Sequence, residues 1–367
     1  MKFLHTADWQ IGMKAQSVGK AGERVREERL AACRRAVEAA KANRVDLVLV
    51  AGDVFENNGI ERVLVQKVAD IMAEFGVPVY IIPGNHDPLM PGSVWEHPAW
   101  KSSRNLYLLL EEAPLNRDGF VLYPCPVREK NSDRNPTAWI PAERGEIIRI
   151  GLAHGTVEGI HQEEPDYPIP RDAARRAGLD YLALGHWHSY TPYPQGGDCL
   201  MAYSGTHEAT KFGERDSGNV LIVDIPNPGA LPKIIPVRTG ALNWIKMEEE
   251  LRAGGDPGRL RKRIESLDEP AKTLLDVNIG GFLIAEERSE LDHIEQILCS
   301  RFISGHLDTS RLRPSPEDDN WVNNLPLGVI RETARRLQEL IRAEGESAEV
   351  AARALRELYA INKGVPQ

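Results

Sequence analysis

LVLVAGD, at residues 47–53, is a run of five apolar residues that ends in glycine and aspartate. Its apolar side chains fall on both faces of an extended chain, which is typical of a strand that is covered on both sides. A strand of this kind belongs to a sheet with other layers packed against it, and it predicts an α/β fold. Asp53 lies just beyond the strand, where a turn begins.

Four further apolar runs end in residues that can bind a metal ion. Ligands of open α/β sheets collect beyond the carboxyl ends of the strands, so these residues are expected to meet in one crevice. Glycines beside them permit tight turns and close approach of the backbone. The runs are FLHTAD (3–8), VYIIPGNHD (79–87), IRIGLAH (148–154) and YLALGHWH (181–188), which end at Asp8, at Asn85 with His86, at His154, and at His186 with His188.

These residue types predict a centre that holds two divalent cations. Carboxylate and amide oxygens together with imidazoles suit manganese, iron or zinc better than copper. Two ions about 3.5–4 Å apart can hold the attacking and the departing oxygen of a phosphoryl displacement, and Asp53, from the middle of the sheet, is expected to bridge them. His86 adjoins Asn85, and an imidazole there can donate a proton to the leaving oxygen.

Each residue has a structural alternative when it is considered singly. An aspartate after a strand is usually a turn or cap residue, and GNHD (84–87) can be a simple turn. A lone histidine at a strand end is more often structural than a ligand. The order and context of five strand ends together favour the metal centre.

The chain is expected to hold one large domain and several smaller parts. Strand and helix patterns alternate through residues 1–240, and residues 241–308 predict a small α/β unit. Polar residues, two prolines and an acidic run predict a linker at 309–324, before two amphipathic helices in 325–367. The other helices are expected at 23–43, about 60–75, about 171–177, 257–267 and 286–298.

The composition and the net charge limit the classes of protein to which this chain can belong. The 367 residues are 42% hydrophobic and 27% charged, and the four cysteines form no CxxC pair. No apolar run approaches the roughly 20 residues that a membrane span needs, and the first residues lack the core of a signal peptide, so a cytoplasmic location is expected. The net charge of −9 is unfavourable for tight DNA binding by this chain alone, although bound cations or a local basic stripe can offset it.

The motifs resemble those of the calcineurin-like metallophosphoesterase superfamily, which carries D-x-H, GD, GNH, a lone His and G-H-x-H in this order. HTADWQIG (5–12), GDVFE (52–56) and YSGTHEATKFGE (203–214) are more similar to the SbcD-type DNA repair nucleases, bacterial relatives of the meiotic-recombination nuclease. The resemblance covers about residues 1–240. It implies a two-sheet sandwich flanked by helices, with a small α/β capping domain and C-terminal helices.

The resemblance also implies a role for each residue at the strand ends. Manganese is the expected metal, with iron, zinc or magnesium as alternatives. His86 is the implied catalytic imidazole, and Asp87 is expected to orient it. One ion is expected at Asp8, Asp53 and His188, and the other at Asp53, Asn85, His154 and His186.

Gln10 departs from the family pattern, which has a histidine two residues after the first aspartate. A glutamine oxygen is a weaker, neutral ligand. We therefore expect lower metal occupancy at the Asp8 and His188 position than at the other. Further along the chain, Lys211 and Arg215 are expected near the phosphate, whereas His207 is expected to be structural.

Three functions remain as alternatives. The first is a DNA nuclease, acting in repair as a homodimer with an SbcC-type coiled-coil ATPase docked on the C-terminal helices. The second is a small-molecule phosphodiesterase or phosphatase, which tolerates the negative charge but has less need of residues 241–367. The third is a weakly active or non-catalytic DNA-end assembly subunit, which the presence of His86 and of six of the seven family ligands argues against. The C-terminal helices can also pack back on the catalytic domain, although the acidic linker favours a partner.

Overall fold

The computed structural model divides into two compact units, Met1–Leu242 and Asn243–Gln367. The residues described are 1–159, 166–193, 198–252, 255–316, 318–345 and 347–364.

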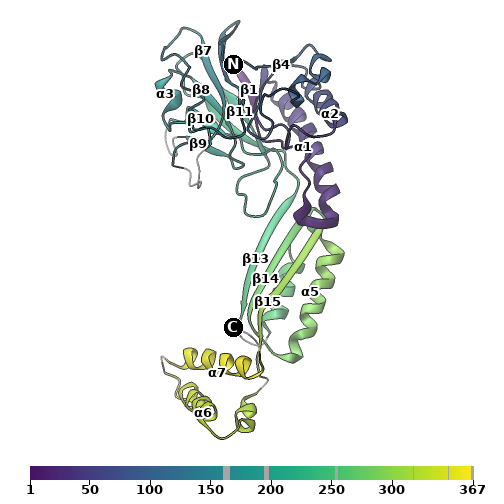
Figure 1. Cartoon of the computed structure of the whole chain (residues 1–367), viewed down its shortest axis with the longest axis vertical. Helices are drawn as coiled ribbons and strands as arrows, with labels where there is room; N and C mark the ends of the chain where they lie inside the picture. The colour runs from purple at the N-terminus through teal and green to yellow at the C-terminus, as the bar shows by residue number, and fades with distance from the viewer. Residues whose placement is uncertain (160–165, 194–197, 253–254, 317, 346, 365–367) are drawn as a thin grey trace. The chain divides into compact units, whose positions relative to one another are not determined.

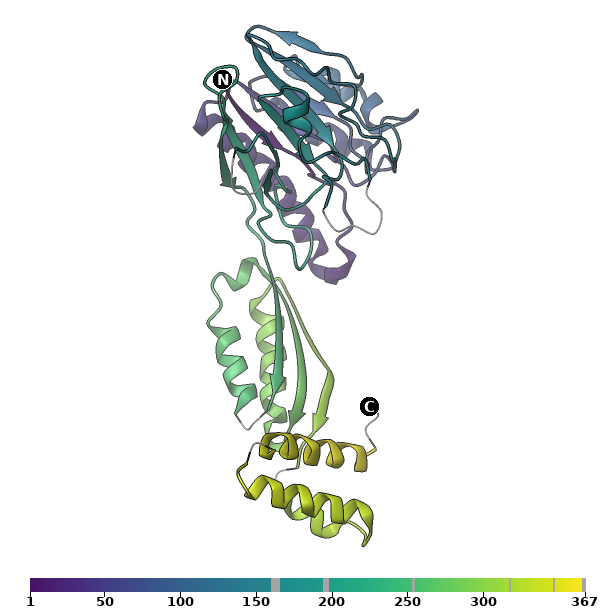
Figure 2. The same ribbon diagram turned by 90° about the vertical axis from the view of Figure 1, so that its left-hand side faces the viewer.

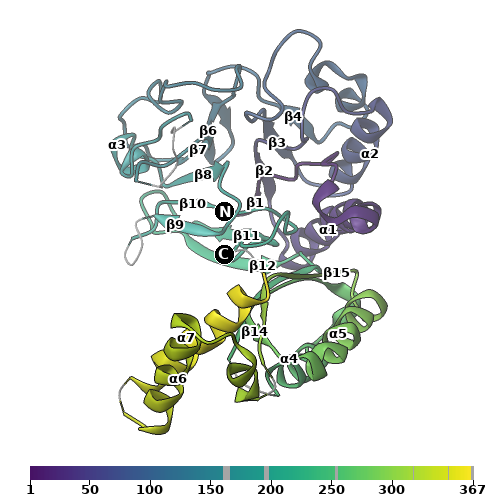
Figure 3. The same ribbon diagram turned by 60° about the horizontal axis from the view of Figure 1, so that its bottom comes forward.

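The first unit contains two six-stranded sheets, which face one another in Figure 3. Strand order in the first sheet is β12-β11-β1-β2-β3-β4, and in the second it is β5-β6-β7-β8-β10-β9. The first sheet consists of β1 (Lys2–Thr6), β2 (Leu47–Ala51), β3 (Val79–Ile82), β4 (Leu106–Leu108), β11 (Asn219–Asp224) and β12 (Lys233–Arg238). The second consists of β5 (Leu115–Arg117), β6 (Phe120–Cys125), β7 (Ile148–His154), β8 (Tyr181–Gly185), β9 (Thr191–Tyr193) and β10 (Met201–Tyr203).

Strand β2 illustrates why the central strands are apolar throughout. Successive side chains of a strand point to opposite faces of its sheet. Val48 and Val50 pack in the core cluster that includes the helices, whereas Leu47 and Leu49 pack in the cluster between the two sheets. All five residues of the strand are buried. The two-sided sheet expected from the sequence is confirmed.

Helices cover the outer faces of this sandwich, as Figure 1 shows. Apolar residues of α1 and α2 pack on the first sheet, and residues of α3 pack in the outer core of the second. Among the described residues, no helix combines the length and the apolar character needed to cross a membrane. The helices are α1 (Gly22–Asn43), α2 (Arg62–Ala73) and α3 (Ala173–Arg176), all at positions expected from the sequence, with short 3-10 helices at Gln16–Ala21, Val94–Glu96 and Pro98–Lys101.

The second unit begins with a parallel sheet of order β13-β14-β15. Leu260, Ile264 and Leu291, from its two helices, share a core cluster with Leu275 and Val277 of the central strand. Figure 3 shows both helices on one face of the sheet. The elements are β13 (Asn243–Leu251), α4 (Asp256–Glu265), β14 (Thr273–Leu283), α5 (Arg288–Arg301) and β15 (Ser304–Pro314), with 3-10 helices at Pro270–Lys272 and Ala285–Glu287.

The chain ends in two packed helices, α6 (Val329–Arg342) and α7 (Ala348–Asn362), drawn in yellow in Figure 2. The structure differs here from the predicted linker at 309–324. Strand β15 continues to Pro314, and a 3-10 helix at Asp319–Asn324 contributes Val322 to the core of the helix pair.

Helix α7 is also tied to the small sheet, so the helix pair is not detached from it. Glu357 forms an ion pair with Arg313 of β15. The guanidinium of Arg356 lies 5.4 Å from the centroid of the Phe282 ring.

Candidate metal centre

The ends of β1, β2 and β7 bring two carboxylates and one imidazole together. Ligand atoms of Asp8, Asp53 and His154 all lie within 4.8 Å of one another, and the three residues are buried. The Asp53 Oδ1 atom is 3.5 Å from His154 Nε2, and the Asp8 Oδ1 atom is 4.0 Å from His154 Nδ1. Since β7 belongs to the second sheet, the centre lies at the carboxyl ends of strands from both sheets.

The backbone at these strand ends adopts unusual conformations. Asp8, Gln10, Asp53 and His186 have φ values of 54°, 42°, 52° and 107°. Positive φ is uncommon outside glycine, and such strain concentrates at functional sites. Packing is tight as well, because a Cβ atom on Gly84 would lie 2.2 Å from Asp53 Oδ1. The backbone at the strand ends therefore adopts strained conformations that bring the side chains together.

His154 and Asn85 present two acceptor atoms to each other. Burial lowers the pKa of His154 to about 3, so its imidazole is neutral and carries one N–H. His154 Nδ1 lies 2.9 Å from the carbonyl oxygen of Ala51, a position suited to donation, which leaves Nε2 without a proton.

The Asn85 amide is oriented by Asp166. Asn85 Nδ2 donates to Asp166 Oδ2 at 3.1 Å, so Oδ1 of the amide faces His154 Nε2 at 2.8 Å. His154 Nε2 and Asn85 Oδ1 are both acceptors, and no proton is shared between them. A cation between or beside the two atoms would stabilise this close contact. Asp166 was not predicted from the sequence, because it follows no strand and lies 81 residues from Asn85.

His186 supplies a further ligand atom to the same place. Its Nε2 is buried and has no hydrogen-bond partner among the described residues, while its Nδ1 lies 3.3 Å from Asn85 Oδ1. Burial and then His154 lower the pKa of His186 to about 3. Burial and then the charge of Asp53 raise the pKa of Asp8 well above its usual range. An unpartnered imidazole nitrogen beside two buried carboxylates fits a divalent cation.

His188 is held by a carboxylate that sequence reasoning missed. Its Nδ1 lies 2.7 Å from Glu214 Oε1. This contact fixes the ring so that the other nitrogen, Nε2, points away from Glu214 and can act as a ligand. Thr210 donates its N–H to Glu214 Oε2 at 2.8 Å. Burial alone would raise the pKa of Glu214, but the hydrogen bond and charge of His188, with the bonds from Thr210, lower it.

His86 and Asp87 differ in role from each other. The His86 N–H donates to Asp53 Oδ1 at 2.8 Å, and ring atom Nδ1 lies 3.0 Å from the Glu56 carbonyl oxygen. With Nδ1–H directed at that carbonyl oxygen, Nε2 of the same ring is an acceptor in the neutral imidazole and carries a proton for a substrate only in the charged imidazolium.

Asp87 does not orient His86, contrary to the expectation. Its carboxylate accepts the N–H of Phe55 at 2.9 Å and that of Gly84 at 2.7 Å. Burial and then the charge of Asp53 raise the pKa of Asp87 to about 8. Asp87 therefore joins two of the strand-end loops.

The loop that holds Gln10 runs beside the loop after β2. Gln10 donates its N–H to the Asp53 carbonyl oxygen at 2.9 Å, and Asp8 donates to that of Gly52 at 3.1 Å. Only 6% of Gln10 is exposed. A buried amide thus occupies the position where the family pattern has an imidazole.

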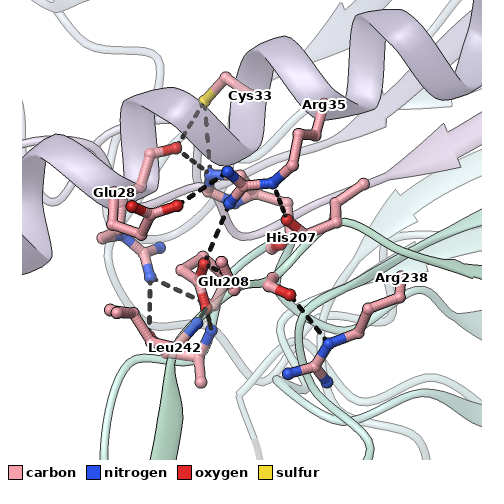
Figure 4. Close-up of polar contacts among 12 residues, drawn as sticks. Glu28, Cys33, Arg35, His207, Glu208, Arg238 and Leu242 are labelled. Atoms are coloured by element: carbon pink, nitrogen blue, oxygen red, sulfur yellow. Dashed lines mark hydrogen bonds and ion pairs between the residues drawn. The ribbon is translucent and has the colours of Figure 1, made fainter. Parts of the chain in front are cut away.

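A buried polar cluster behind the centre supports this loop. Arg29 of α1 is 1% exposed, and its guanidinium donates to the carbonyl oxygens of Glu208, at 2.9 Å, and Asp8, at 3.5 Å. Figure 4 shows Arg35 reaching the carboxylate of Glu208, at 3.3 Å, and His207 beneath the same helix. His207 is fully buried, as a structural histidine would be. An arginine in an amphipathic helix predicts a solvated face, so the sequence could not reveal this support.

The comparisons with known proteins point to phosphoesterases. The family of calcineurin-like phosphoesterases matches residues 1–190. The uncharacterized metallophosphoesterase YhaO of Bacillus subtilis is 28% identical over 200 residues, which are 51% of this chain and 48% of that protein. The chain therefore spans about half the length of that relative.

Two other likenesses are more distant. The D component of the SbcCD nuclease of Staphylococcus saprophyticus is 23% identical over 273 residues, 65% of this chain and 69% of that protein. The crystal structure of TT1561 of Thermus thermophilus is 12% identical, with a TM-score of 0.43, over 65% of this chain and 98% of that one.

Proposed function

The chain belongs to the calcineurin-like phosphoesterase family, and on that premise we propose that it is a manganese-dependent nuclease that cleaves phosphodiester bonds of DNA. The family makes it a hydrolase of phosphoesters. The observation that carries the metal dependence is the meeting of Asp8, Asp53 and His154 within 4.8 Å. Beside them lies His186 Nε2, which has no hydrogen-bond partner in the part of the chain that the structure describes.

The residues at the centre have different roles in hydrolysis. When bound, a pair of divalent cations supplies positive charge to the phosphate and activates the water. In our proposal Asp53, Asn85, His154 and His186 hold one ion, and Asp8, Asp53 and His188 hold the other. His86 acts as the charged imidazolium: it keeps Nδ1–H toward the Glu56 carbonyl oxygen and passes its Nε2 proton to the departing oxygen, while its backbone N–H keeps Asp53 in place.

The choice of DNA rests on the second unit and on one relative. The Staphylococcus saprophyticus protein is named as a component of a nuclease. Here, large apolar side chains are exposed on and beside α6 and α7, as at surfaces that bind a partner. We propose that a coiled-coil ATPase of the SbcC type docks there, that residues 241–308 cap the catalytic domain, and that the protein acts as a homodimer. The exposed residues are Leu327, Val329, Ile330, Leu340, Val350 and Ile361.

A single set of assays tests this proposal. The purified protein is incubated with Mn²⁺ and, in parallel, with labelled single- and double-stranded DNA, bis-para-nitrophenyl phosphate and cyclic nucleotides. We expect DNA cleavage that is lost in His86→Ala and kept in His293→Ala, whose histidine is exposed on α5. Turnover of small diesters without DNA cleavage would instead support a small-molecule phosphodiesterase. Binding of DNA without any turnover would support an assembly subunit.

A further inference from the structure

A hollow of about 490 Å³ opens in the first unit where β7 and β8 begin. Arg149, the second residue of β7, and Asp180, which directly precedes β8, both line it. The candidate ligands His154 and His186 lie at the other ends of the same two strands. At about 3.3 Å per residue, the five steps along β7 from Arg149 to His154 amount to roughly 16 Å. The hollow is therefore separate from the candidate metal centre.

Arg149 brings a buried positive charge to the wall of this hollow. It is 5% exposed, and its guanidinium donates to the hydroxyl of Tyr123 and to the carbonyl oxygens of Pro141, at 2.8 Å, and Ala177, at 3.3 Å. All three acceptors are neutral. Within the described part of the chain, Arg149 Nε has no hydrogen-bond partner. Because a buried charge is costly without a counter-charge, an anion in the hollow would stabilise this arginine.

Two further arginines line the hollow from its rim. Arg144 and Arg175 are exposed, and neither side chain forms an ion pair with another described residue. Arg176, the next residue of α3, is instead paired with Asp172 at 2.7 Å. The planar guanidinium matches the geometry of a phosphate, to which it can donate two parallel hydrogen bonds. The arginines of the rim are thus suited to hold a phosphate group.

Two carboxylates also line the hollow, and they differ in their effect on an anion. Asp180 is buried and accepts the backbone N–H of Arg149 at 2.8 Å and that of Gly229 at 2.6 Å, so both of its oxygens already have donors. Asp198 is exposed, and its charge opposes the binding of an anion. Removal of the Asp198 charge should therefore strengthen binding, which a purely structural role of the hollow does not predict.

The remaining wall is largely apolar. It includes Leu179, Leu200 and Leu231, and Leu231 is 54% exposed although it is a large aliphatic side chain. Pockets for small organic molecules have volumes of about 300–1,000 Å³ and combine apolar walls with a few polar groups. The hollow has the size and the walls for a ligand that carries an organic part as well as a phosphate.

We propose that this hollow binds a small organic phosphate of about the size of a nucleoside monophosphate. Arg144 and Arg175 donate to the phosphate beside the charge of Arg149, and the organic part lies against the leucine side chains. The proposal does not rest on the proposed nuclease function, because it uses no residue of the metal centre.

Calorimetry on the full chain tests the proposal, with a chelator present so that no ligand binds through cations at the metal centre. The probes are adenosine 5′-monophosphate, thymidine 5′-monophosphate and ribose 5-phosphate, with adenosine and inorganic phosphate for comparison. We expect at least one of the three organic phosphates to bind, more tightly than inorganic phosphate, and adenosine not to bind. Arg144→Gln and Arg175→Gln should each weaken this binding by roughly tenfold.

Three further variants show where the ligand binds. Asp198→Asn should tighten the binding by about threefold, and Arg176→Gln, the control on the same helix, should leave it unchanged. Asp53→Asn should also leave it unchanged; loss of binding in that variant would place the ligand at the metal centre and overturn the proposal. The proposal also fails if none of the three organic phosphates binds the wild type, or if inorganic phosphate binds as tightly as they do.

Discussion

The two halves of the candidate centre are built differently. The first half consists of Asp53, Asn85, His154 and His186. Asn85, His154 and Asp53 are 8%, 0% and 2% exposed, and His154 lies against both Asn85 and Asp53. In the second half the His188 side chain is 21% exposed, and its partner is Glu214 rather than another candidate ligand.

Because the halves differ in burial and in ligand type, we expect them to bind metal with unequal affinity. The ligand atoms of the first half are buried acceptors that repel one another, and a bound cation removes this repulsion. The second half has Gln10 where the family has an imidazole, and its His188 side chain is 21% exposed. We therefore expect one tight ion and one weaker ion, and the variants below test whether the two affinities differ.

The largest effect is expected from Asp53→Asn. Both halves use this carboxylate in our account, so both ions should be lost and hydrolysis of bis-para-nitrophenyl phosphate should fall by roughly a thousandfold. Asp46→Asn is the matched control, because Asp46 is exposed and precedes the same strand. Metal counting beside the rate assay checks the reason for the loss; full activity of the Asp53→Asn variant would refute a bridging role.

A pair of histidine variants separates the halves. His154→Ala should weaken the tight ion by roughly a hundredfold, whereas His188→Ala should leave that ion in place and lose the weaker one. Titration of each variant with Mn²⁺ by calorimetry measures both affinities. Equal losses of both ions in both variants would mean that the halves are not distinct.

A smaller effect is expected from Glu214→Gln. The amide removes the charge that favours the Nδ1–H tautomer of His188, so the weaker ion should bind about tenfold less tightly while the tight ion is unaffected. The same calorimetric titration provides the measurement, with Glu143→Gln, an exposed residue, as the control. Weakening of the tight ion instead would place Glu214 in the wrong half.

The smallest effect is expected from Gln10→His. Histidine tolerates positive φ better than most residues, so it should fit the loop and tighten the weaker ion by roughly threefold. Gln10→Ala should not tighten it. Two equally tight ions in the wild type, unchanged in Gln10→Ala, would contradict the inequality of the halves.

The sequence predicts one part of this site well and another part poorly. Asp8 and Asp53 follow neighbouring parallel strands of one sheet, so their meeting follows from the strand pattern. His154 follows a strand of the other sheet, and the packing of the two sheets brings it to the same place. Asp166 and Glu214 could not be predicted, because their contacts with Asn85 and His188 depend on the path of irregular loops. The fold, too, could be predicted only in part.

The α/β pattern and the long helices were predicted, since helix and strand periodicities are local properties of the sequence. The polar stretch at 309–314 was expected to be a linker, but it pairs as an outer strand of a small sheet. Many side chains of β15 are partly or fully exposed, so the strand lacks the apolar signature. Asp87 was similarly misread, because its neighbours in space are two backbone N–H groups rather than the adjacent imidazole.

Anomalous diffraction from crystals grown with increasing Mn²⁺ is the most direct test of the unequal centre. At low Mn²⁺ we predict a single peak bounded by Asp53, Asn85, His154 and His186, and a second peak beside Asp8 and His188 only at higher concentration. A saturated crystal with no manganese next to Asp53, or with both peaks equally strong from the start, would contradict the account.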